Sequence, residues 1–379
     1  MEFPVRTEAL VVESAGAAFE MTPIVIDELR PDEVLVEMKY SGFCHTDILV
    51  QQGVLPGLEL PAIPGHEGAG IVRAIGSQVK DKTLRVGDAV LLSFTVCGQC
   101  APCGEQRLTK CVVHPVVNFR ATRLGTDNTT SARLARDGRP VRSQFFGQSS
   151  FARLSAVHEV CVVKCPYPDD LAVYAPLGCG YQTGAGTVLN VLKPRTYDSI
   201  VIFGMGCVGS AALMAAAHLQ VRQIVAVDVV ERKLALAMEL GATDTVNPAG
   251  NTAGLAEQIR ALTGGGASFC VDTTGVPAVI EQMLDCLAHG GTAASIGAPP
   301  GGARIQVDVA AFLYQNKNWV SIIEGDSFPP KFIPELMELH RQGRFPIDKI
   351  CKVYPIEDLD RAIADMKSGE VIKPVLQFS

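Results

Sequence analysis

The sequence predicts an α/β protein in which a doubly wound parallel sheet is inserted into a split, β-rich domain. Two observations support this fold class. Strands alternate with helices between about residues 181 and 324, and short apolar runs broken by Gly and Pro fill the chain on either side. Repeated β–α–β units place parallel strands in one sheet. We therefore expect one domain from residues 1–180 and 325–379 and a second from residues 181–324.

The outer parts of the chain have the pattern of an irregular β domain. Residues 34–38 and 89–92 are typical apolar runs, and no long segment with helical periodicity follows either of them. Near the end of the chain we expect a helix over residues 334–342 and a last strand over residues 374–378.

The central part predicts strands and helices in alternation. Pro277 suits the first turn of a helix, where its missing N–H is not needed, and Gly241 and the pair Gly290-Gly291 are expected to end helices. The expected elements are a strand at 199–203, a helix at 208–219, a strand at 224–227, helices at 231–240 and 255–262, a strand at 269–272, a helix opening at Pro277 and a strand at 292–296.

Composition and charge describe a globular protein that binds neither nucleic acids nor anionic membranes. Of 379 residues, 47% are hydrophobic and 19% charged, which excludes an intrinsically disordered protein. The net charge is −7 and basic runs are missing, so nucleic acids and anionic membranes are excluded as partners. Residues 200–217 carry no charge, but glycines divide them. We interpret them as a strand, a turn and a buried helix rather than a membrane span.

The twelve cysteines indicate metal ligation or catalysis rather than disulfide bonds. The N-terminal segment has no apolar region of the kind found in secretory signals. The final residues Gln377-Phe378-Ser379 match neither a retention signal nor a peroxisomal signal. We therefore expect a cytoplasmic protein with reduced cysteines.

A glycine-rich turn predicts a dinucleotide site. Residues 204–209 read G-M-G-C-V-G and match the pattern G-x-G-x-x-G between a predicted strand and a predicted helix. Gly204 permits the tight turn, Gly206 lets a pyrophosphate approach the backbone, and Gly209 allows close packing of the helix on the strand. The alternative is an α/β turn that binds no nucleotide.

Asp228 indicates which dinucleotide is preferred. It ends the next predicted strand, where its carboxylate would accept hydrogen bonds from ribose hydroxyls and repel a 2′-phosphate. Lys233 could reach the same ribose. The sequence therefore favours NAD over NADP.

Four closely spaced cysteines predict a closed metal site. They follow the spacing C-x2-C-x2-C-x7-C among small residues, which lets the backbone wrap around one zinc ion with Zn–S distances of about 2.3 Å. Four thiolates leave no coordination position open, so a zinc ion here would be structural. A redox dithiol or an iron–sulfur cluster is the alternative. The four residues are Cys97, Cys100, Cys103 and Cys111.

A second candidate metal set is spread over three segments. Cys44 lies in the string G-F-C-H-T-D, His66 in P-G-H-E-G-A-G, and Cys179 in L-G-C-G. Two thiolates and an imidazole would bind Zn²⁺ and leave a fourth position open, an arrangement that polarises an alcohol or carbonyl oxygen. Spacing alone does not show that the three converge, and a lone Cys or His is more often structural than a ligand.

Together these motifs resemble the zinc-dependent medium-chain alcohol dehydrogenase family. The strings G-F-C-H-T-D and G-H-E, the four cysteines, C-G-Y-Q-T-G at residues 179–184 and the glycine turn occur in this order, and the match extends to Lys373. The H-T-D context, L-G-C-G and E-G-D-S at residues 324–327 are most similar to aryl (benzyl-type) alcohol dehydrogenases. The resemblance implies a GroES-like catalytic domain around a Rossmann NAD-binding domain, two Zn²⁺ per chain with NAD as cofactor, and a homodimer paired at sheet edges.

The resemblance also implies roles for single residues. Cys44, His66 and Cys179 would bind the catalytic zinc, Glu67 would lie behind the ion, and Asp47 would orient the His66 imidazole. Further positions would lie near the reacting groups: Thr46 to take the alcohol proton, His45 and Lys373 near the pyrophosphate, Thr183 and Val208 near the nicotinamide, and Phe94 in the alcohol pocket.

One position departs from the family pattern. Many members carry a histidine five residues after the first zinc ligand, where this chain has Leu49, so water or another base must complete proton transfer. The resemblance implies an NAD- and zinc-dependent dehydrogenase that interconverts a primary, aromatic or allylic alcohol and its aldehyde. The alternatives are an S-(hydroxymethyl)glutathione-type dehydrogenase, a zinc-free medium-chain reductase and a non-catalytic zinc- and NAD-binding redox sensor.

Overall fold

The computed structural model describes residues 2–125, 127–249 and 254–378. The strands are β1 Val5–Val11, β2 Glu20–Ile26, β3 Glu33–Gly42, β4 Gly68–Ile75, β5 Ala89–Leu92, β6 Ala132–Leu134, β7 Pro140–Val141, β8 Leu154–His158, β9 Val162–Lys164, β10 Ser199–Phe203, β11 Gln223–Val227, β12 Asp244–Val246, β13 Ala267–Asp272, β14 Leu287–Ser295, β15 Asn318–Ser321, β16 Cys351–Pro355 and β17 Lys373–Gln377.

The α-helices lie between these strands and in the segments that lead to them. They are α1 His45–Gln52, α2 Ala101–Gly104, α3 His114–Phe119, α4 Leu171–Tyr174, α5 Gly180–Gly186, α6 Cys207–His218, α7 Glu231–Glu239, α8 Leu255–Leu262, α9 Pro277–Asp285, α10 Val309–Tyr314, α11 Pro329–Arg341 and α12 Leu359–Ser368. Within the described ranges, no helix combines the length and the apolar character needed to cross a membrane.

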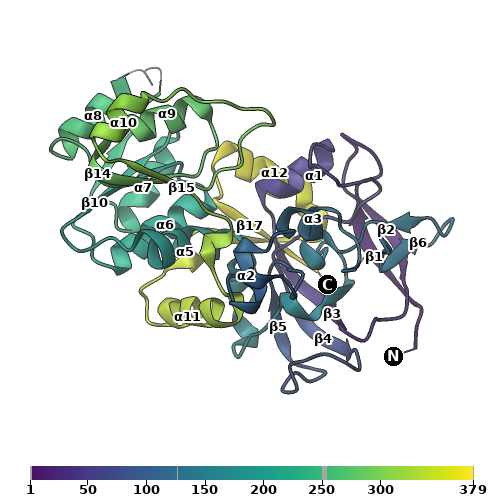
Figure 1. Cartoon of the computed structure of the whole chain (residues 1–379). Helices are drawn as coiled ribbons and strands as arrows, with labels where there is room; N and C mark the ends of the chain where they lie inside the picture. Colours follow the sequence, from purple (N-terminus) through teal and green to yellow (C-terminus); the bar gives the residue numbers. More distant parts are fainter. Residues whose placement is uncertain (1, 126, 250–253, 379) are drawn as a thin grey trace.

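Six parallel strands form the central sheet, in the order β12-β11-β10-β13-β14-β15. Counted along the chain, this is the Rossmann order 3-2-1-4-5-6, in which the direction of winding reverses between β10 and β13. Such a reversal opens a crevice at the carboxyl ends of the strands, where a dinucleotide binds. The predicted doubly wound sheet is confirmed, and Figure 1 shows it as the teal and green part of the molecule.

Most predicted elements of the central part appear within two residues of their expected ends, including β10, α6 and α7. The prediction for Gly290 and Gly291 was wrong, because α9 already ends at Asp285 and both glycines lie inside β14. The pairing of β14 with β13 shifts register between the Ala267 and Phe269 partners, so the glycines belong to an irregular stretch of the strand. The helix α11 begins earlier than expected, at Pro329.

The end of the chain returns to the β-rich part. A mixed sheet has the order β16-β17-β3-β4-β5-β9, with β8 also paired to β3, and a separate sheet has the order β1-β2-β6-β7. Strand β17 pairs antiparallel with β3, and Figure 1 shows yellow β17 and α12 lying beside the purple and blue N-terminal part. We retain residues 1–180 with 325–379, and residues 181–324, as the proposed division into domains.

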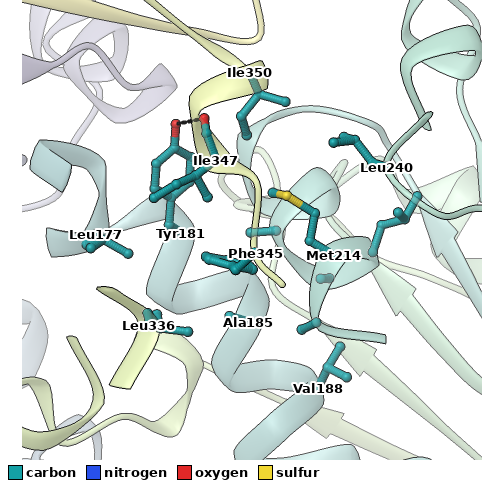
Figure 2. Close-up of a cluster of buried hydrophobic side chains, with 14 of the residues drawn as sticks. Leu177, Tyr181, Ala185, Val188, Met214, Leu240, Leu336, Phe345, Ile347 and Ile350 are labelled. Atoms are coloured by element: carbon teal, nitrogen blue, oxygen red, sulfur yellow. Dashed lines mark hydrogen bonds between the residues drawn. The ribbon is translucent and has the colours of Figure 1, made fainter. Parts of the chain in front are cut away.

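A buried hydrophobic cluster fixes α5 at the junction of the two parts (Figure 2). Tyr181 and Ala185 of α5 are fully buried against Met214 of α6 and Phe345 near the end of the chain. The Tyr181 hydroxyl also donates to the Ile347 carbonyl, 3.5 Å away. Each large apolar side chain buried in this way contributes about 1.5–3 kcal/mol. The start of α5 is therefore held rigidly, and the residue before it is Cys179.

Candidate active site

The carboxylate of Asp47, in the first turn of α1, connects the segment around Cys44 with the segment around His66. Cys44 is the N-cap of α1, and Oδ2 of Asp47 accepts a hydrogen bond from its backbone N–H at 2.9 Å. Oδ1 of Asp47 accepts from the Gly65 N–H at 3.0 Å and lies 3.1 Å from Nδ1 of His66. Asp47 is fully buried, so its geometry is well constrained. It fixes both the Cys44 backbone and the orientation of the His66 ring.

The structure brings together the three candidate ligands that lie far apart in the sequence. Ligand atoms of Cys44, His66, Glu67 and Cys179 lie within 4.8 Å of one another. Because Asp47 engages Nδ1, the buried Nε2 of His66 is left without a hydrogen-bond partner among the described residues. Buried polar atoms without partners are rare. Two sulfurs and a free imidazole nitrogen are the ligands that zinc prefers, so these residues fit the ion.

The charges in this cluster are strongly coupled. A hydrogen bond from Cys179 lowers the pKa of the Cys44 thiol well below its ordinary value, although burial opposes the change. The same hydrogen bond and burial raise the pKa of Cys179. Burial disfavours the charged form of His66, but Asp47 and Cys44 outweigh it and raise the pKa of His66. The cluster thus holds protons that a divalent cation would replace on binding.

Behind the cluster lies a buried ion pair. Nζ of Lys373 lies 2.9 and 2.8 Å from the two Glu67 carboxylate oxygens, and it also donates to the Phe43 carbonyl at 3.2 Å. The Gly180 N–H donates to Glu67 as well. Gly42 permits this packing, because a Cβ there would lie 1.9 Å from Glu67 Oε2. The family resemblance implies that Lys373 lies near the pyrophosphate, and a contact with the cofactor stays a prediction.

Thr46, expected to take the alcohol proton, and His45, expected near the pyrophosphate, lie on the first turn of α1. Oγ1 of Thr46 lies 3.7 Å from the Cys44 sulfur, at the edge of the cluster. His45 is beside it, and Leu49 lies on the same helix. The Leu49 side chain can accept no proton, so a relay through α1 ends at Thr46 or passes to solvent.

Two buried glutamines that the sequence did not single out tie the segments of the site together. Nε2 of Gln148 donates to the carbonyl groups of His66 and Ser93, both at 2.9 Å. Nε2 of Gln182 donates to Ser93 Oγ at 2.7 Å and to the Gly178 carbonyl at 2.6 Å. Gln182 lies in the C-G-Y-Q-T-G string, which could have drawn attention to it. No sequence signal marked Gln148.

A third residue without a predicted role is Glu324, which is only 6% exposed. Its Oε1 lies 3.6 Å from the Cys179 sulfur. Its Oε2 accepts from Gln182 Nε2 and Thr183 Oγ1, both at 3.3 Å. Burial raises the pKa of Glu324 to about 7. From the sequence, the string E-G-D-S served only to indicate similarity to the aryl-type branch. The structure places Glu324, the first residue of that string, against a candidate metal ligand.

Aromatic rings surround the His66 imidazole. Phe146 stacks on it with ring centroids 4.7 Å apart, and Phe145 meets it edge-on at 5.6 Å. The sequence had not linked these two rings to the site. Phe94, which was expected in the alcohol pocket, is buried, and its ring centroid lies 5.4 Å from that of His114. A contact between Phe94 and the substrate stays a prediction.

The four closely spaced cysteines form a second cluster, here called the four-cysteine lobe (residues 97–111). Their sulfurs lie within 4.8 Å of one another, with Cys100 and Cys103 3.4 Å apart and Cys97 and Cys111 3.6 Å apart. The Val112 and Cys103 N–H groups lower the pKa of Cys100 to about 6, while burial raises the pKa of Cys103 to about 12. Four convergent sulfurs fit a tetrahedral zinc ion with no open position.

The glycine turn has the shape that a dinucleotide requires. Gly204 has a φ of +93°, which L-residues with a side chain rarely adopt. A Cβ on Gly209 would lie 1.8 Å from the Gly204 carbonyl oxygen, so only glycine lets α6 pack this closely. A Cβ on Gly206, by contrast, would meet no atom of the described residues within 4 Å beyond its own chain neighbours. This space leaves room for a pyrophosphate at the N-terminus of α6.

Asp228 lies at the end of β11 next to this turn. Its carboxylate accepts hydrogen bonds from the Met205 N–H at 2.6 Å and the Val230 N–H at 2.9 Å. Lys233, on α7, lines a cavity of about 420 Å³ that also reaches β16. Asp228 therefore lies beside the turn, and contact of Asp228 or Lys233 with the adenosine ribose of a dinucleotide stays a prediction.

The two residues expected near the nicotinamide lie on neighbouring helices. Thr183 is on α5 and Val208 is in the first turn of α6. The helices approach so closely that a Cβ on Gly184 would lie 2.0 Å from the Val208 carbonyl oxygen. This contact links the Cys179 side of the site to the glycine turn.

Comparison with known families covers both parts of the chain. A model described as "Zinc-binding dehydrogenase" matches residues 207–341, and one described as "Alcohol dehydrogenase GroES-like domain" matches residues 30–167. The sequence is 36% identical over 374 residues to a geraniol dehydrogenase from Castellaniella defragrans, covering 99% of this chain and 98% of that enzyme.

Solved structures give the same result. Benzyl alcohol dehydrogenase from Acinetobacter calcoaceticus matches with a TM-score of 0.92 and 36% identity, covering 99% of this chain and 100% of that one. An alcohol dehydrogenase zinc-binding domain protein from Burkholderia ambifaria matches with a TM-score of 0.93 and 42% identity, covering 99% of each chain. The similarity therefore extends over nearly the whole molecule.

Proposed function

This chain belongs to the zinc-binding medium-chain alcohol dehydrogenase family, and on that basis we propose that it interconverts a primary, aromatic or allylic alcohol and its aldehyde with NAD as cofactor. The observation that carries the proposal is the convergence of Cys44, Cys179 and the unpartnered Nε2 of His66. A free imidazole nitrogen beside two sulfurs is the arrangement that a zinc ion would complete. A non-catalytic sensor would also give the Thr46 hydroxyl no role beside this cluster beyond packing.

In this proposal, the residues of the site position the reactants and move a proton. Bound zinc would polarise the alcohol oxygen, and bound NAD would accept the hydride. The hydroxyl of Thr46, next to Cys44, takes the alcohol proton and passes it outward. The glycine turn and α6 hold the pyrophosphate, while Thr183 and Val208 set the position of the nicotinamide.

The substrate class rests on the relatives and on the aromatic rings at the site. Geraniol and benzyl alcohol, for which two relatives are named, are primary alcohols whose CH₂OH group is bonded to an sp² carbon. The rings of Phe145 and Phe146 pack against His66, so this side of the site is apolar. An apolar, aromatic environment suits a flat unsaturated group better than the charged peptide of a glutathione adduct.

A panel of alcohols tests the proposed function. We expect reduced nicotinamide to form from NAD faster with benzyl alcohol, cinnamyl alcohol and a terpene alcohol than with ethanol, measured as kcat/KM from the absorbance of the reduced cofactor. Faster turnover of ethanol would reject the substrate class while keeping the mechanism. Turnover only with formaldehyde and glutathione would replace the proposal by a glutathione-adduct dehydrogenase.

Replacing Asp228 with Ala is expected to relax the preference for NAD over NADP by about 10- to 100-fold in kcat/KM, because the carboxylate both binds ribose hydroxyls and repels a 2′-phosphate. The measurement is the ratio of kcat/KM with the two cofactors. The exposed carboxylate of Glu257, on α8 of the same domain, is a matched control, and Glu257→Ala should leave the ratio unchanged. An unaltered ratio in Asp228→Ala would show that another group reads the ribose.

We further propose that two copies pair through β15. This strand is the last in the central sheet, and an unpaired edge can add a strand from a second copy. Apolar side chains beside it are exposed: Trp319 is 45% exposed, and Leu313 and Tyr314 of α10 are 70% and 80% exposed. Such a patch is rare on a monomer and typical of an interface. A second copy would both hydrogen-bond to the unpaired edge of β15 and cover the exposed apolar side chains.

This arrangement predicts the mass of the protein in solution. Light scattering coupled to size exclusion should give twice 40.3 kDa for the wild type and a shift towards one chain for Leu313→Asp, because the charge would be buried in the interface. Val86, an exposed valine in the β-rich part, provides a control, and Val86→Asp should remain dimeric. A wild-type mass of one chain would refute pairing at β15.

A further inference from the structure

The segment that carries Glu324 has an unusual backbone. Glu324, Gly325 and Asp326 have φ angles of +48°, +66° and +48°, so three consecutive residues lie in the left-handed region. Residues with a side chain seldom adopt this conformation, and it persists only where the surrounding structure holds it. The turn Glu324–Asp326 must therefore be fixed by its neighbours.

One side of the turn is held by α5 and the helical segment that follows it. A Cβ on Gly325 would lie 2.2 Å from the Gln182 carbonyl oxygen, and one on Gly186 would lie 2.3 Å from the Gly325 carbonyl oxygen. Two glycines thus allow backbone-to-backbone contact. Nδ2 of Asn190 donates to the Gly325 carbonyl at 3.0 Å. These contacts fix the middle of the turn.

The other side of the turn is held by the four-cysteine lobe. Oγ1 of Thr109 donates to Oδ1 of Asp326 at 2.5 Å, and Nζ of Lys110 lies 3.6 Å from the same oxygen. Thr109 is buried and lies between the third and fourth cysteines of the lobe, Cys103 and Cys111. The order that four sulfurs around one ion would impose on this short segment is therefore transmitted to Asp326.

At its inner end the turn reaches the candidate active site. Oε1 of Glu324 lies 3.6 Å from the sulfur of Cys179, a candidate zinc ligand, and Oε2 lies 3.3 Å from Oγ1 of Thr183, which is expected beside the nicotinamide. A continuous path of contacts thus leads from Thr109 through Asp326 and Glu324 to Cys179. Each step is a polar contact or a peptide segment held in a single conformation.

We propose that the four-cysteine lobe holds the turn Glu324–Asp326 in place, and that Asp326 is a positioning residue that acts through Glu324 on Cys179 and Thr183. The roles of Cys179 and Thr183 rest on the proposed function. Without the Thr109 contact, the turn can relax out of the left-handed region, and Glu324 then withdraws from both side chains. The lobe therefore supports catalysis as well as local stability.

The test replaces Asp326 and follows the metal site by a signal that does not depend on turnover. In protein loaded with Co²⁺, the absorption band that Cys44→Ser removes belongs to the site of Cys44, His66 and Cys179. In Asp326→Ala we expect both metal ions to be retained, this band to shift, and kcat to fall by about 10- to 100-fold, as for other small displacements in active sites. An unchanged band would overturn the proposal.

Two further variants separate positioning from simple damage. Asp326→Asn keeps an acceptor for Thr109 and tolerates the left-handed region, so kcat should return to within about threefold of the wild type. Glu105→Ala removes an exposed carboxylate of the same lobe, paired with Arg107, and should change neither the band nor kcat. Failure of Asp326→Asn to restore kcat would contradict positioning by this acceptor.

A double-mutant cycle tests the route through Glu324. If Asp326 acts through Glu324, then Asp326→Ala added to Glu324→Gln should reduce kcat no further than Glu324→Gln alone, whereas independent effects would multiply and refute the route. If Asp326→Ala fails to fold, Thr109→Val removes the same hydrogen bond from the other partner. If the wild type oxidises no alcohol, the proposed function fails, and the cobalt band in these variants still decides the positioning.

Discussion

Cys44→Ser is expected to lower alcohol oxidation by at least about 1,000-fold, because loss of a thiolate ligand removes several kcal/mol of stabilisation from the transition state. The sulfur of Cys44 lies in the cluster with His66 and Cys179, and Asp47 holds its backbone, so the serine would occupy the same place with a harder and less acidic ligand atom. Cys179→Ala should have the same effect. The measurement is kcat/KM with the alcohol that the wild type oxidises fastest.

Metal analysis gives this prediction its control. The four-cysteine lobe shares no residue with the first cluster, so Cys44→Ser should retain one zinc per chain and lose the other. Cys351→Ser changes a half-buried cysteine outside both clusters and should keep both ions and full activity. Wild-type turnover in Cys44→Ser, or loss of both ions, would refute the division into a catalytic and a structural site.

The parts of the site that the sequence predicts best are those built from one short segment. The glycine turn and the four-cysteine lobe each lie within fifteen residues or fewer, so their spacing already constrains their geometry. Cys44, His66 and Cys179 come from three distant segments, and only the resemblance to a family could place them together. The structure shows their convergence directly.

Residues whose contacts lie far away in the sequence could not be recognised from any local sequence pattern. Gln148 contacts the His66 backbone across 82 positions, and Glu324 meets Cys179 across 145. Both are buried polar groups whose partners are decided by tertiary packing, which single-sequence patterns do not encode. The mistaken end of α9 has a similar origin, because the pairing of β14 with β13 accommodates Gly290 and Gly291 inside a strand.

Lys373 is another residue whose partner could not be read from the sequence. Resemblance placed it beside the pyrophosphate, whereas its Nζ here lies within 2.9 Å of Glu67, 306 positions away. Both side chains are almost completely buried. Removing one partner from such a pair leaves an uncompensated charge in the interior, which is far more costly than the loss of an exposed ion pair.

Lys373→Met should therefore lower the free energy of unfolding by about 3–5 kcal/mol, measured by urea denaturation of the zinc-loaded protein at about pH 8. Adding Glu67→Gln should recover most of the loss, since neither member of the pair then carries a buried charge. Lys331→Met breaks the exposed pair with Glu335 and should cost less than about 1 kcal/mol. A loss below about 1 kcal/mol in Lys373→Met would show that Glu67 is stabilised without it.

The pH dependence of this loss follows from the carboxyl group. Burial raises the pKa of Glu67, and the charge of Lys373 opposes that rise, so the pKa in the folded variant is higher still. A carboxyl group with a folded pKa above its unfolded value binds more protons when folded, and the variant loses stability as pH increases between the two values. Below this range Glu67 is protonated in both states. The difference between Lys373→Met and the wild type should therefore be smaller at about pH 5 than at about pH 8, and an equal loss at both would mean that Glu67 stays charged.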